Sequence, residues 1–311
     1  MKPLRVGTRG SPLALAQTRI VTDRIRRLFP GIEIEQRVVR TTGDRFSRAA
    51  LSRLAGQSKG LFVKEIEEAL LEKAIDLAVH SLKDLPAQLP PGLHLAAFPE
   101  RETATDAFVS FLPCKSISEL PDRARVGTGS LRRRIQLLAL RPDLEIVPIR
   151  GNIRTRLDRI RREALAGVVL AAAGLTRLGL EDRIAFEFGP DEMVPAVGQG
   201  ALAIEVRRND RRVLEVAESL DHPRTRTAVE AERAFLAAMG GGCQVPMGAH
   251  VRPVDDGFEV TAFAADENGA SLDRFRSRCS LLELSRTIEK AVRRLQETGS
   301  AESGKPIEGR R

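Results

Sequence analysis

The stretch VKEIEEALLEKAIDLAV, residues 63–79, contains a helical pattern followed directly by a strand pattern. Between 63 and 74 the apolar residues recur near helical spacing and glutamates occupy the other faces, which predicts an amphipathic helix. Residues 75–79 have the composition of a short buried strand. The sequence HSLKDLP, residues 80–86, comes next, so Asp84 lies just beyond the carboxyl end of the predicted strand.

The alternation of strand and helix recurs along most of the chain. Residues 4–8 form a strand-like run, and Ser11-Pro12 supply an N-cap and a first helical position for the next helix. Residues 168–173 are a second continuous apolar run, as expected for a buried parallel strand. Near the C-terminus the pattern changes to a strand over 258–264 and a helix over 281–295. We therefore predict α/β domains followed by a small α+β module.

The charged residues favour binding of small polyanions. The formal net charge is +8, and 42 basic residues are arginine against 8 lysines. Arginine presents a planar fork of donors that matches carboxylates and phosphates. A nucleic-acid binder is an alternative suggested by the isoelectric point of about 10.0. However, Trp and Tyr are absent, which leaves few stacking platforms, and no DNA- or RNA-binding motif occurs.

Cysteine and histidine usage argues against two kinds of site. The cysteines Cys114, Cys243 and Cys279 are scattered and odd in number, which favours free thiols in a reducing compartment. The histidines lie far apart and no Cys-x-x-Cys or His-Glu-x-x-His motif occurs, so no metal is predicted. Neither a long apolar span nor a targeting leader is present, so we expect a cytoplasmic protein without membrane binding.

Three predicted strand-to-helix junctions combine glycine, hydroxyl residues and arginine. They are residues 7–11 (GTRGS), 127–133 (GTGSLRR) and 150–156 (RGNIRTR). Glycine lets the backbone approach a ligand, and the helix start offers free N–H groups and partial positive charge. A single such junction is also what ordinary caps and turns look like. Three together predict a ligand with several carboxylates.

Two further residues are candidates for chemistry. Asp84 follows a predicted parallel strand, where ligands bind in open α/β sheets, although it could instead cap a helix or pair with Lys83. Cys243 follows three glycines, which indicates a mobile loop with an exposed thiol. These residues alone leave open whether Cys243 is a nucleophile, a redox site or neither.

Taken together, these segments resemble the porphobilinogen deaminase family. The resemblance rests on motifs in the family's order, and it covers the chain to about Gly248. The motifs are TRGSPLA (8–14), KGLFVKE (59–65), HSLKD (80–84), GTGSLRR (127–133), RGN (150–152), AGLTRLG (173–179), PAVGQG (195–200) and GGCQVP (241–246).

The resemblance implies a transferase that joins four porphobilinogens head to tail into hydroxymethylbilane, with release of ammonia, in tetrapyrrole biosynthesis. A dipyrromethane made from two porphobilinogens would be attached to Cys243 through a thioether and would prime the chain. Porphobilinogen carries an acetate and a propionate, so the growing polypyrrole accumulates carboxylates. This matches the arginine-bearing junctions.

The resemblance also assigns roles to individual positions. Asp84 is the expected catalytic acid. Besides Cys243, the expected cofactor-binding residues are Lys83, Ser130, Arg132, Arg133, Arg150, Gly151, Ser81, Asp44 and Thr128. The expected substrate-binding residues are Arg9, Ser11, Arg156, Arg177, Gln199, Lys59 and Phe62. The sequence departs from the family at Gly129, where a second serine is common, and over 52–58, which is longer than in some members. Arg154 receives no role.

The implied fold has two lobes like those of periplasmic binding proteins plus the small C-terminal α+β domain. We expect residues 1–98 and 201–218 in the first lobe, 99–200 in the second and 219–311 in the C-terminal domain that carries Cys243. We expect a monomer that does not bind nucleic acid. A non-enzymatic anion-binding protein of the same two-lobed architecture is the alternative, and it would need neither Asp84 nor Cys243.

Overall fold

The computed structural model describes residues 2–41, 63–240 and 246–300. Within these ranges the strands form two five-stranded sheets and one three-stranded sheet. The five-stranded sheets belong to two α/β lobes, and the three-stranded sheet belongs to a C-terminal α+β domain. The predicted fold class is therefore confirmed.

Lobe 1 contains the elements nearest the N-terminus and a later return of the chain. Its elements are β1 (Leu4–Arg9), α1 (Pro12–Leu28), β2 (Ile34–Val39), α4 (Lys64–Leu71), β3 (Leu77–Ser81), the 3-10 turn η2 (Leu82–Asp84), β4 (Leu93–Ala97), β10 (Leu202–Arg207) and α8 (Arg211–Glu218). The strand order is β2-β1-β3-β10-β4. β1, β2 and β3 are parallel, whereas β10 is antiparallel to β3 and β4.

Lobe 2 repeats this topology. Its elements are β5 (Asp106–Val109), η3 (Ile117–Glu119), β6 (Arg125–Gly127), α5 (Leu131–Leu140), β7 (Glu145–Val147), α6 (Ile153–Arg162), β8 (Gly167–Ala171), α7 (Ala172–Thr176), η4 (Glu181–Arg183) and β9 (Ile184–Glu187). The strand order is β7-β6-β8-β5-β9, with β5 antiparallel to both neighbours. The chain crosses between the lobes twice, over residues 98–105 (the first crossing) and residues 188–201 (the second crossing). In each lobe the antiparallel strand directly follows one of these crossings, β5 after the first and β10 after the second.

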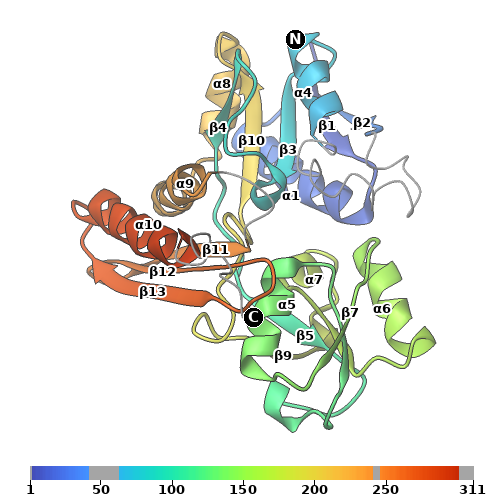
Figure 1. Ribbon diagram of the computed structural model, residues 1–311. Coiled ribbons are helices and arrows are strands. Elements are labelled where there is room, and N and C mark those ends of the chain that lie inside the picture. Colours follow the sequence, from blue (N-terminus) through green and yellow to red (C-terminus); the bar gives the residue numbers. More distant parts are fainter. Residues whose placement is uncertain (1, 42–62, 241–245, 301–311) are drawn as a thin grey trace, which may run out of the picture.

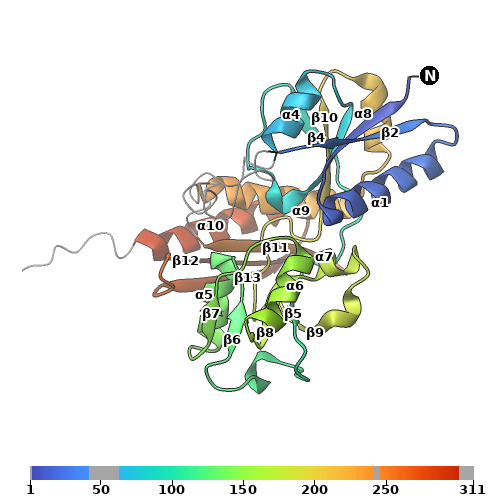
Figure 2. The ribbon, with the colours of Figure 1, turned by 90° about the vertical axis from the view of Figure 1, so that its right-hand side faces the viewer.

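The C-terminal domain consists of α9 (Pro223–Ala238), β11 (Met247–Val254), β12 (Gly257–Ala265), β13 (Leu272–Cys279) and α10 (Leu284–Ser300). Its antiparallel sheet has the order β11-β12-β13, and α9 and α10 pack against it through a shared apolar core. In Figure 1 this domain lies beside the junction of lobe 1 (top) and lobe 2 (bottom). Figure 2 shows the same relation after a quarter turn, so the domain adjoins both lobes.

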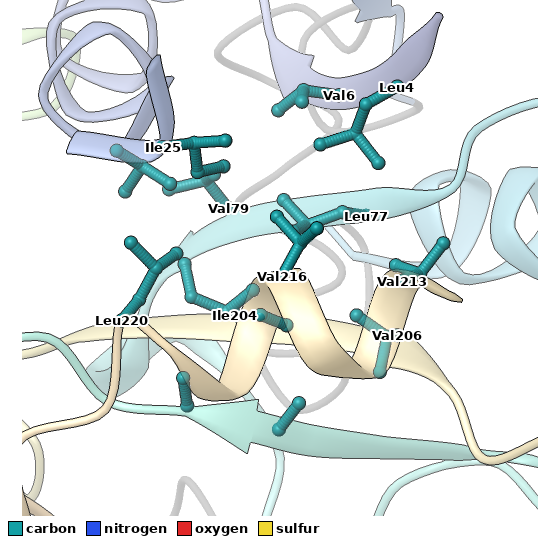
Figure 3. Packing of buried hydrophobic residues seen from close by; sticks show 14 of the residues in the cluster. Leu4, Val6, Ile25, Leu77, Val79, Ile204, Val206, Val213, Val216 and Leu220 are labelled. Carbon is teal, nitrogen blue, oxygen red and sulfur yellow. The ribbon is translucent and has the colours of Figure 1, made fainter. Parts of the chain in front are cut away.

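Side-chain alternation on β3 divides the core of lobe 1 into two layers. Leu77 and Val79 point towards α1 and α8 and pack with Val6, Ile204 and others, as Figure 3 shows. Ala78 points to the opposite face, where α4 covers the sheet. Each fully buried Val, Leu or Ile side chain contributes about 1.5–3 kcal/mol. This packing fixes β3, and with it the residues that follow its carboxyl end.

Several predicted boundaries are wrong for local reasons. The helix expected to Ala74 ends at Leu71, because Lys73 adopts a positive φ of 60° and starts a turn. The strand expected over 75–79 is consequently displaced to Leu77–Ser81, so that His80 and Ser81 belong to it.

Two other runs also differ from expectation. The apolar run 168–173 splits, because β8 ends at Ala171 and the alanines after it, which are good helix formers, begin α7. The helix expected from 281 begins at Leu284, since Glu283 accepts a hydrogen bond from the backbone N–H of Ser280 in a preceding turn (3.1 Å). The strands expected over 4–8 and 258–264, and the helix starting at Ser11-Pro12, are confirmed.

Candidate active site

The predicted site residues of lobe 1 follow the carboxyl ends of β1 and β3. Arg9 ends β1, and Ser11 caps α1 by accepting a hydrogen bond from the backbone N–H of Ala14 (3.2 Å). Ser81 ends β3, and its hydroxyl is hydrogen-bonded to the side-chain amide of Gln17 on α1 (2.8 Å to Nε2). Because neighbouring parallel strands end at the same edge of a sheet, these residues line one edge of lobe 1.

Lys83 and Asp84 lie in the short turn η2 immediately beyond β3. Leu82 anchors this turn, since its side chain is buried and its N–H donates to the carbonyl of Ala201 (3.0 Å). The Asp84 side chain is exposed, and Asp84 is the last residue of the turn rather than an N-cap. Lys83 Nζ donates to Gln199 Oε1 (3.4 Å), and no Lys83–Asp84 ion pair occurs in the described part of the chain.

The side chain of Lys83, in lobe 1, is influenced by charged side chains of lobe 2. Burial and the nearby positive charge of Arg133 lower the pKa of Lys83 to about 8, while Asp84 and Asp106 act in the opposite direction. Arg133 and Asp106 belong to lobe 2. The Lys83 ammonium of lobe 1 is therefore close enough to lobe 2 for its protonation to depend on that lobe's charges.

The second junction lies at the start of α5. Ser130 caps this helix, and its backbone N–H donates to Thr128 Oγ1 (3.2 Å), so the buried Thr128 hydroxyl shapes the turn. Arg132 and Arg133 are buried, at 7% and 6% exposure. Both bind the carboxylate of Asp106, with Arg132 Nη2 2.8 Å from Oδ2 and Arg133 Nε 2.8 Å from Oδ1. The two guanidinium groups are thus paired with a carboxylate of the protein itself.

The third junction, between β7 and α6, requires its glycine. Gly151 has a φ of +111°, and a Cβ there would lie 2.9 Å from Thr155 Cγ2. Arg150 is exposed and forms no ion pair with the described residues. Arg156 Nε donates to the carbonyl of Gly151 (2.8 Å). Burial, then Arg133, lowers the pKa of Arg156 to about 10, and Asp84 opposes this, so Arg156 also lies across from lobe 1.

Arg177 and Gln199 connect this edge to the crossings. Arg177 Nη2 donates to the carbonyl of Gly200 (2.6 Å), and burial lowers its pKa to about 10 against the influence of Glu102. Gln199 is buried and its amide donates to the carbonyl of Ala104 (2.7 Å), so it joins the two crossings. Together with its contact to Lys83, this places Gln199 where both lobes and both crossings meet.

Four residues of the predicted site, one pair from each lobe, lie close enough to influence one another across the facing edges of the lobes. Charge coupling directly links Lys83, Asp84, Arg133 and Arg156. The predicted residues Asp44, Lys59, Phe62 and Cys243 lie outside the described residues. Sequence reasoning missed Asp106, because an acid at the start of a strand gives no local signal of two arginine partners.

A second missed group joins the crossings to the C-terminal domain. Arg101 binds the buried carboxylate of Glu232 on α9 (2.6 Å), and Arg101 Nε donates to the carbonyl of Gln199 (2.9 Å). Glu232 also accepts hydrogen bonds from the backbone N–H groups of Gly198 (2.7 Å) and Val251 (2.8 Å). Glu232 thereby fastens the C-terminal domain to both crossings between the lobes.

Comparison with known proteins decides the family. The model described as "Porphobilinogen deaminase, dipyromethane cofactor binding domain" matches residues 4–215, and that of the porphobilinogen deaminase C-terminal domain matches residues 226–297. The chain belongs to the porphobilinogen deaminase family. It is 48% identical over 271 residues to the porphobilinogen deaminase of Syntrophobacter fumaroxidans, covering 87% of each chain. It is also 48% identical to that of Syntrophotalea carbinolica over 269 residues, covering 86% of this chain and 84% of the relative.

Solved structures give a more distant comparison. A TRAP periplasmic solute binding protein from Desulfovibrio salexigens aligns with a TM-score of 0.42 at 11% identity, covering 72% of this chain and 73% of that protein. Among the described helices of this porphobilinogen deaminase family member, none has both the length and the apolar character needed to cross a bilayer.

Proposed function

We propose that this chain is a hydroxymethylbilane synthase, the activity of porphobilinogen deaminases. It would condense four porphobilinogens head to tail and release ammonia at each condensation. A dipyrromethane cofactor, attached to Cys243 through a thioether, would supply the primer to which each new unit is joined. Family membership and the domain description that names the cofactor support this function.

The observation that carries the proposal is the excess of cations at the facing edges of the lobes. Among the described residues, Lys83, Arg132, Arg133 and Arg156 lie close to two carboxylates, those of Asp84 and Asp106. Burying like charges together is costly unless anions complete the group. Dipyrromethane and porphobilinogen carry acetate and propionate groups, so their chemistry fits this donor set.

Asp84 is proposed as the catalytic acid. Its side chain is exposed at the edge of lobe 1, close to Lys83 and across from Arg156. From there its carboxyl group would protonate the departing amine and then stabilise the positive charge that develops on the substrate. An exposed carboxylate held on a short, well-anchored turn suits this task, because Leu82 fixes its backbone.

The other predicted residues are proposed to bind carboxylates or to shape the site. Arg150 suits a ligand contact because it is exposed and uncommitted among the described side chains. Cys243 would hold the cofactor. The further members of the proposed site are Arg9, Ser11, Asp44, Lys59, Phe62, Ser81, Thr128, Ser130, Gly151, Arg177 and Gln199.

We further propose that the protein acts as a cytoplasmic monomer that binds porphobilinogen and the growing polypyrrole, without nucleic acid or membrane. Residues 1–98 with 201–218, 99–200 and 219–311 are proposed as its three domains. The two family matches, which divide between residues 215 and 226, support the last boundary.

Denaturing intact-mass measurement tests the proposal directly. Protein from normally grown cells should have the mass of the 34.1 kDa chain plus two linked pyrrole units, and Cys243→Ser should lack the addition. Cys279→Ser is the matched control and should keep it. An unmodified wild-type chain that also releases no hydroxymethylbilane from porphobilinogen would refute the function.

A further inference from the structure

We infer that Asp106 is a positioning residue that holds Arg132 and Arg133 in place for the carboxylates of cofactor and substrate. This inference rests on the proposed function, because it assigns a task within the same site. Asp106 is the first residue of β5, directly after the first crossing, and its side chain is completely buried. Because it is buried, Asp106 would not contact a bound ligand itself and would act through the two arginines.

The geometry ties one carboxylate to two guanidinium groups. Arg132 Nη2 lies 2.8 Å from Asp106 Oδ2 and 3.0 Å from Oδ1. Arg133 approaches Oδ1 with two nitrogens, Nε at 2.8 Å and Nη2 at 2.6 Å. Oδ1 accepts one hydrogen bond from Arg132 Nη2 and one from Arg133 Nε, and such charge-assisted contacts restrict where each guanidinium lies.

Backbone carbonyls complete the support of each arginine. Arg132 Nη1 donates to Val194 O (2.6 Å) in the second crossing, and Arg133 Nη1 donates to Val169 O (2.9 Å) in β8. A carbonyl alone leaves a guanidinium free to rotate about that contact. Asp106 supplies the second point of attachment for both side chains, which defines their orientation.

The charge balance explains why this support serves a ligand. Two adjacent buried guanidiniums repel each other, and burial alone would disfavour their charged form. Burial also opposes ionisation of Asp106, yet the pKa of its carboxyl is lowered, because Arg132 and Arg133 stabilise the carboxylate. One negative charge against two positive charges leaves a net cation. Its influence extends to Lys83 and Arg156, which belong to the facing edges of the lobes.

The test compares Asp106→Asn with a matched control, Asp76→Asn. Asp76 also binds two arginines, Arg5 (2.6 Å) and Arg207 (3.2 Å), but it precedes β3 at the edge of the sheet remote from Lys83. Three quantities are measured for both variants and for wild type. They are the fraction of chains carrying dipyrromethane by denaturing mass, the KM and kcat for porphobilinogen, and the urea midpoint.

We expect Asp106→Asn to lower dipyrromethane loading and to raise KM about tenfold or more, since charge-assisted contacts are lost. Asp76→Asn should lower the urea midpoint but leave loading and KM at wild-type values. Wild-type loading and KM in Asp106→Asn, whatever its midpoint, would overturn the inference and leave Asp106 a purely structural residue.

Should Asp106→Asn fail to fold, Asp106→Glu decides the question. It keeps the charge but moves the carboxylate by one methylene, so the inference requires a raised KM, whereas an unchanged KM and loading would contradict it. Failure of the proposed function is separately visible, because wild-type protein would then carry no dipyrromethane.

Discussion

Replacing Glu232 by glutamine should destabilise the protein, because this side chain joins the C-terminal domain to both crossings between the lobes. Its carboxylate accepts hydrogen bonds from Arg101 Nη1 (2.6 Å) and Nη2 (3.2 Å) and from the backbone N–H groups of Gly198 and Val251. Glutamine retains one oxygen and turns an N–H₂ group towards these donors. Arg101 would then keep a nearly buried charge without its counter-ion, since its side chain is only 11% exposed.

The expected loss is about 3–5 kcal/mol, the usual cost of removing one partner of a buried ion pair. That is a large part of the roughly 5–15 kcal/mol by which native proteins are stable. Urea unfolding at neutral pH, followed by far-UV circular dichroism, measures it. Glu230→Gln is the control, because Glu230 lies on the same helix but is 54% exposed and pairs with Arg226 at the surface.

The control should change the free energy of unfolding by no more than about 0.5 kcal/mol. If the free energies of unfolding of the two variants lie within about 1 kcal/mol of each other, burial of the Arg101–Glu232 pair does not stabilise the protein as proposed. A wild-type urea midpoint in Glu232→Gln would mean that other contacts hold the C-terminal domain to the crossings.

Three further predictions follow from other residues. Asp84→Ala should abolish hydroxymethylbilane formation with little change in urea midpoint, because the side chain is exposed; near-normal turnover would disprove its role as the acid. Burial, followed by repulsion from Glu205, raises the pKa of Glu67 to about 7 while His80 opposes it, so this carboxyl favours folding at low pH and its contribution is lost as pH rises from about 4.5 to 7. Between pH 4.5 and pH 8, the free energy of unfolding of Glu67→Gln should therefore rise by up to about 3 kcal/mol relative to that of wild type, as measured by urea unfolding. The same pH dependence in both proteins would argue against this assignment. Gly129→Ser should lower the thermal midpoint, by the equivalent of about 1–3 kcal/mol, because a Cβ would lie 2.3 Å from the carbonyl oxygen of Ile149; an unchanged midpoint would show that this turn adjusts freely.

The sequence was sufficient to predict the parts of the fold that local patterns determine. Apolar runs indicated β1, β3 and β8, the last two with ends displaced by up to two residues, and the cap at Ser11 located the start of α1. Helix ends were harder to predict, because the end of α4 depends on the positive φ of Lys73 and not on composition. The antiparallel insertion of β10 between β3 and β4 has no local signal, since it pairs segments more than a hundred residues apart.

The candidate site divides in the same way. Motifs placed Lys83 after a strand and Ser130, Arg150 and Arg156 at strand-to-helix junctions, and the structure brings Lys83 and Arg156 to facing edges of the lobes. Asp106 was beyond reach, because its importance comes from Arg132 and Arg133, which lie 26 and 27 residues away along the chain. Partnerships between buried charges are properties of the assembled fold, whereas glycine, hydroxyl and arginine at a helix start are properties of a short sequence.

The late arrival of β10 has a consequence for how the protein is made. Every strand of lobe 2 lies between residues 106 and 187, so lobe 2 can complete its sheet as one continuous segment. Lobe 1 must wait with β3 and β4 unjoined until residues 202–207 have left the ribosome, roughly 5–20 s after β4 at ordinary rates of translation. During that interval the two strands present open edges, which attract other extended chains. Lobe 2 completes its own sheet only near the end of that interval, because β9 ends at Glu187, 15 residues before β10 begins at Leu202.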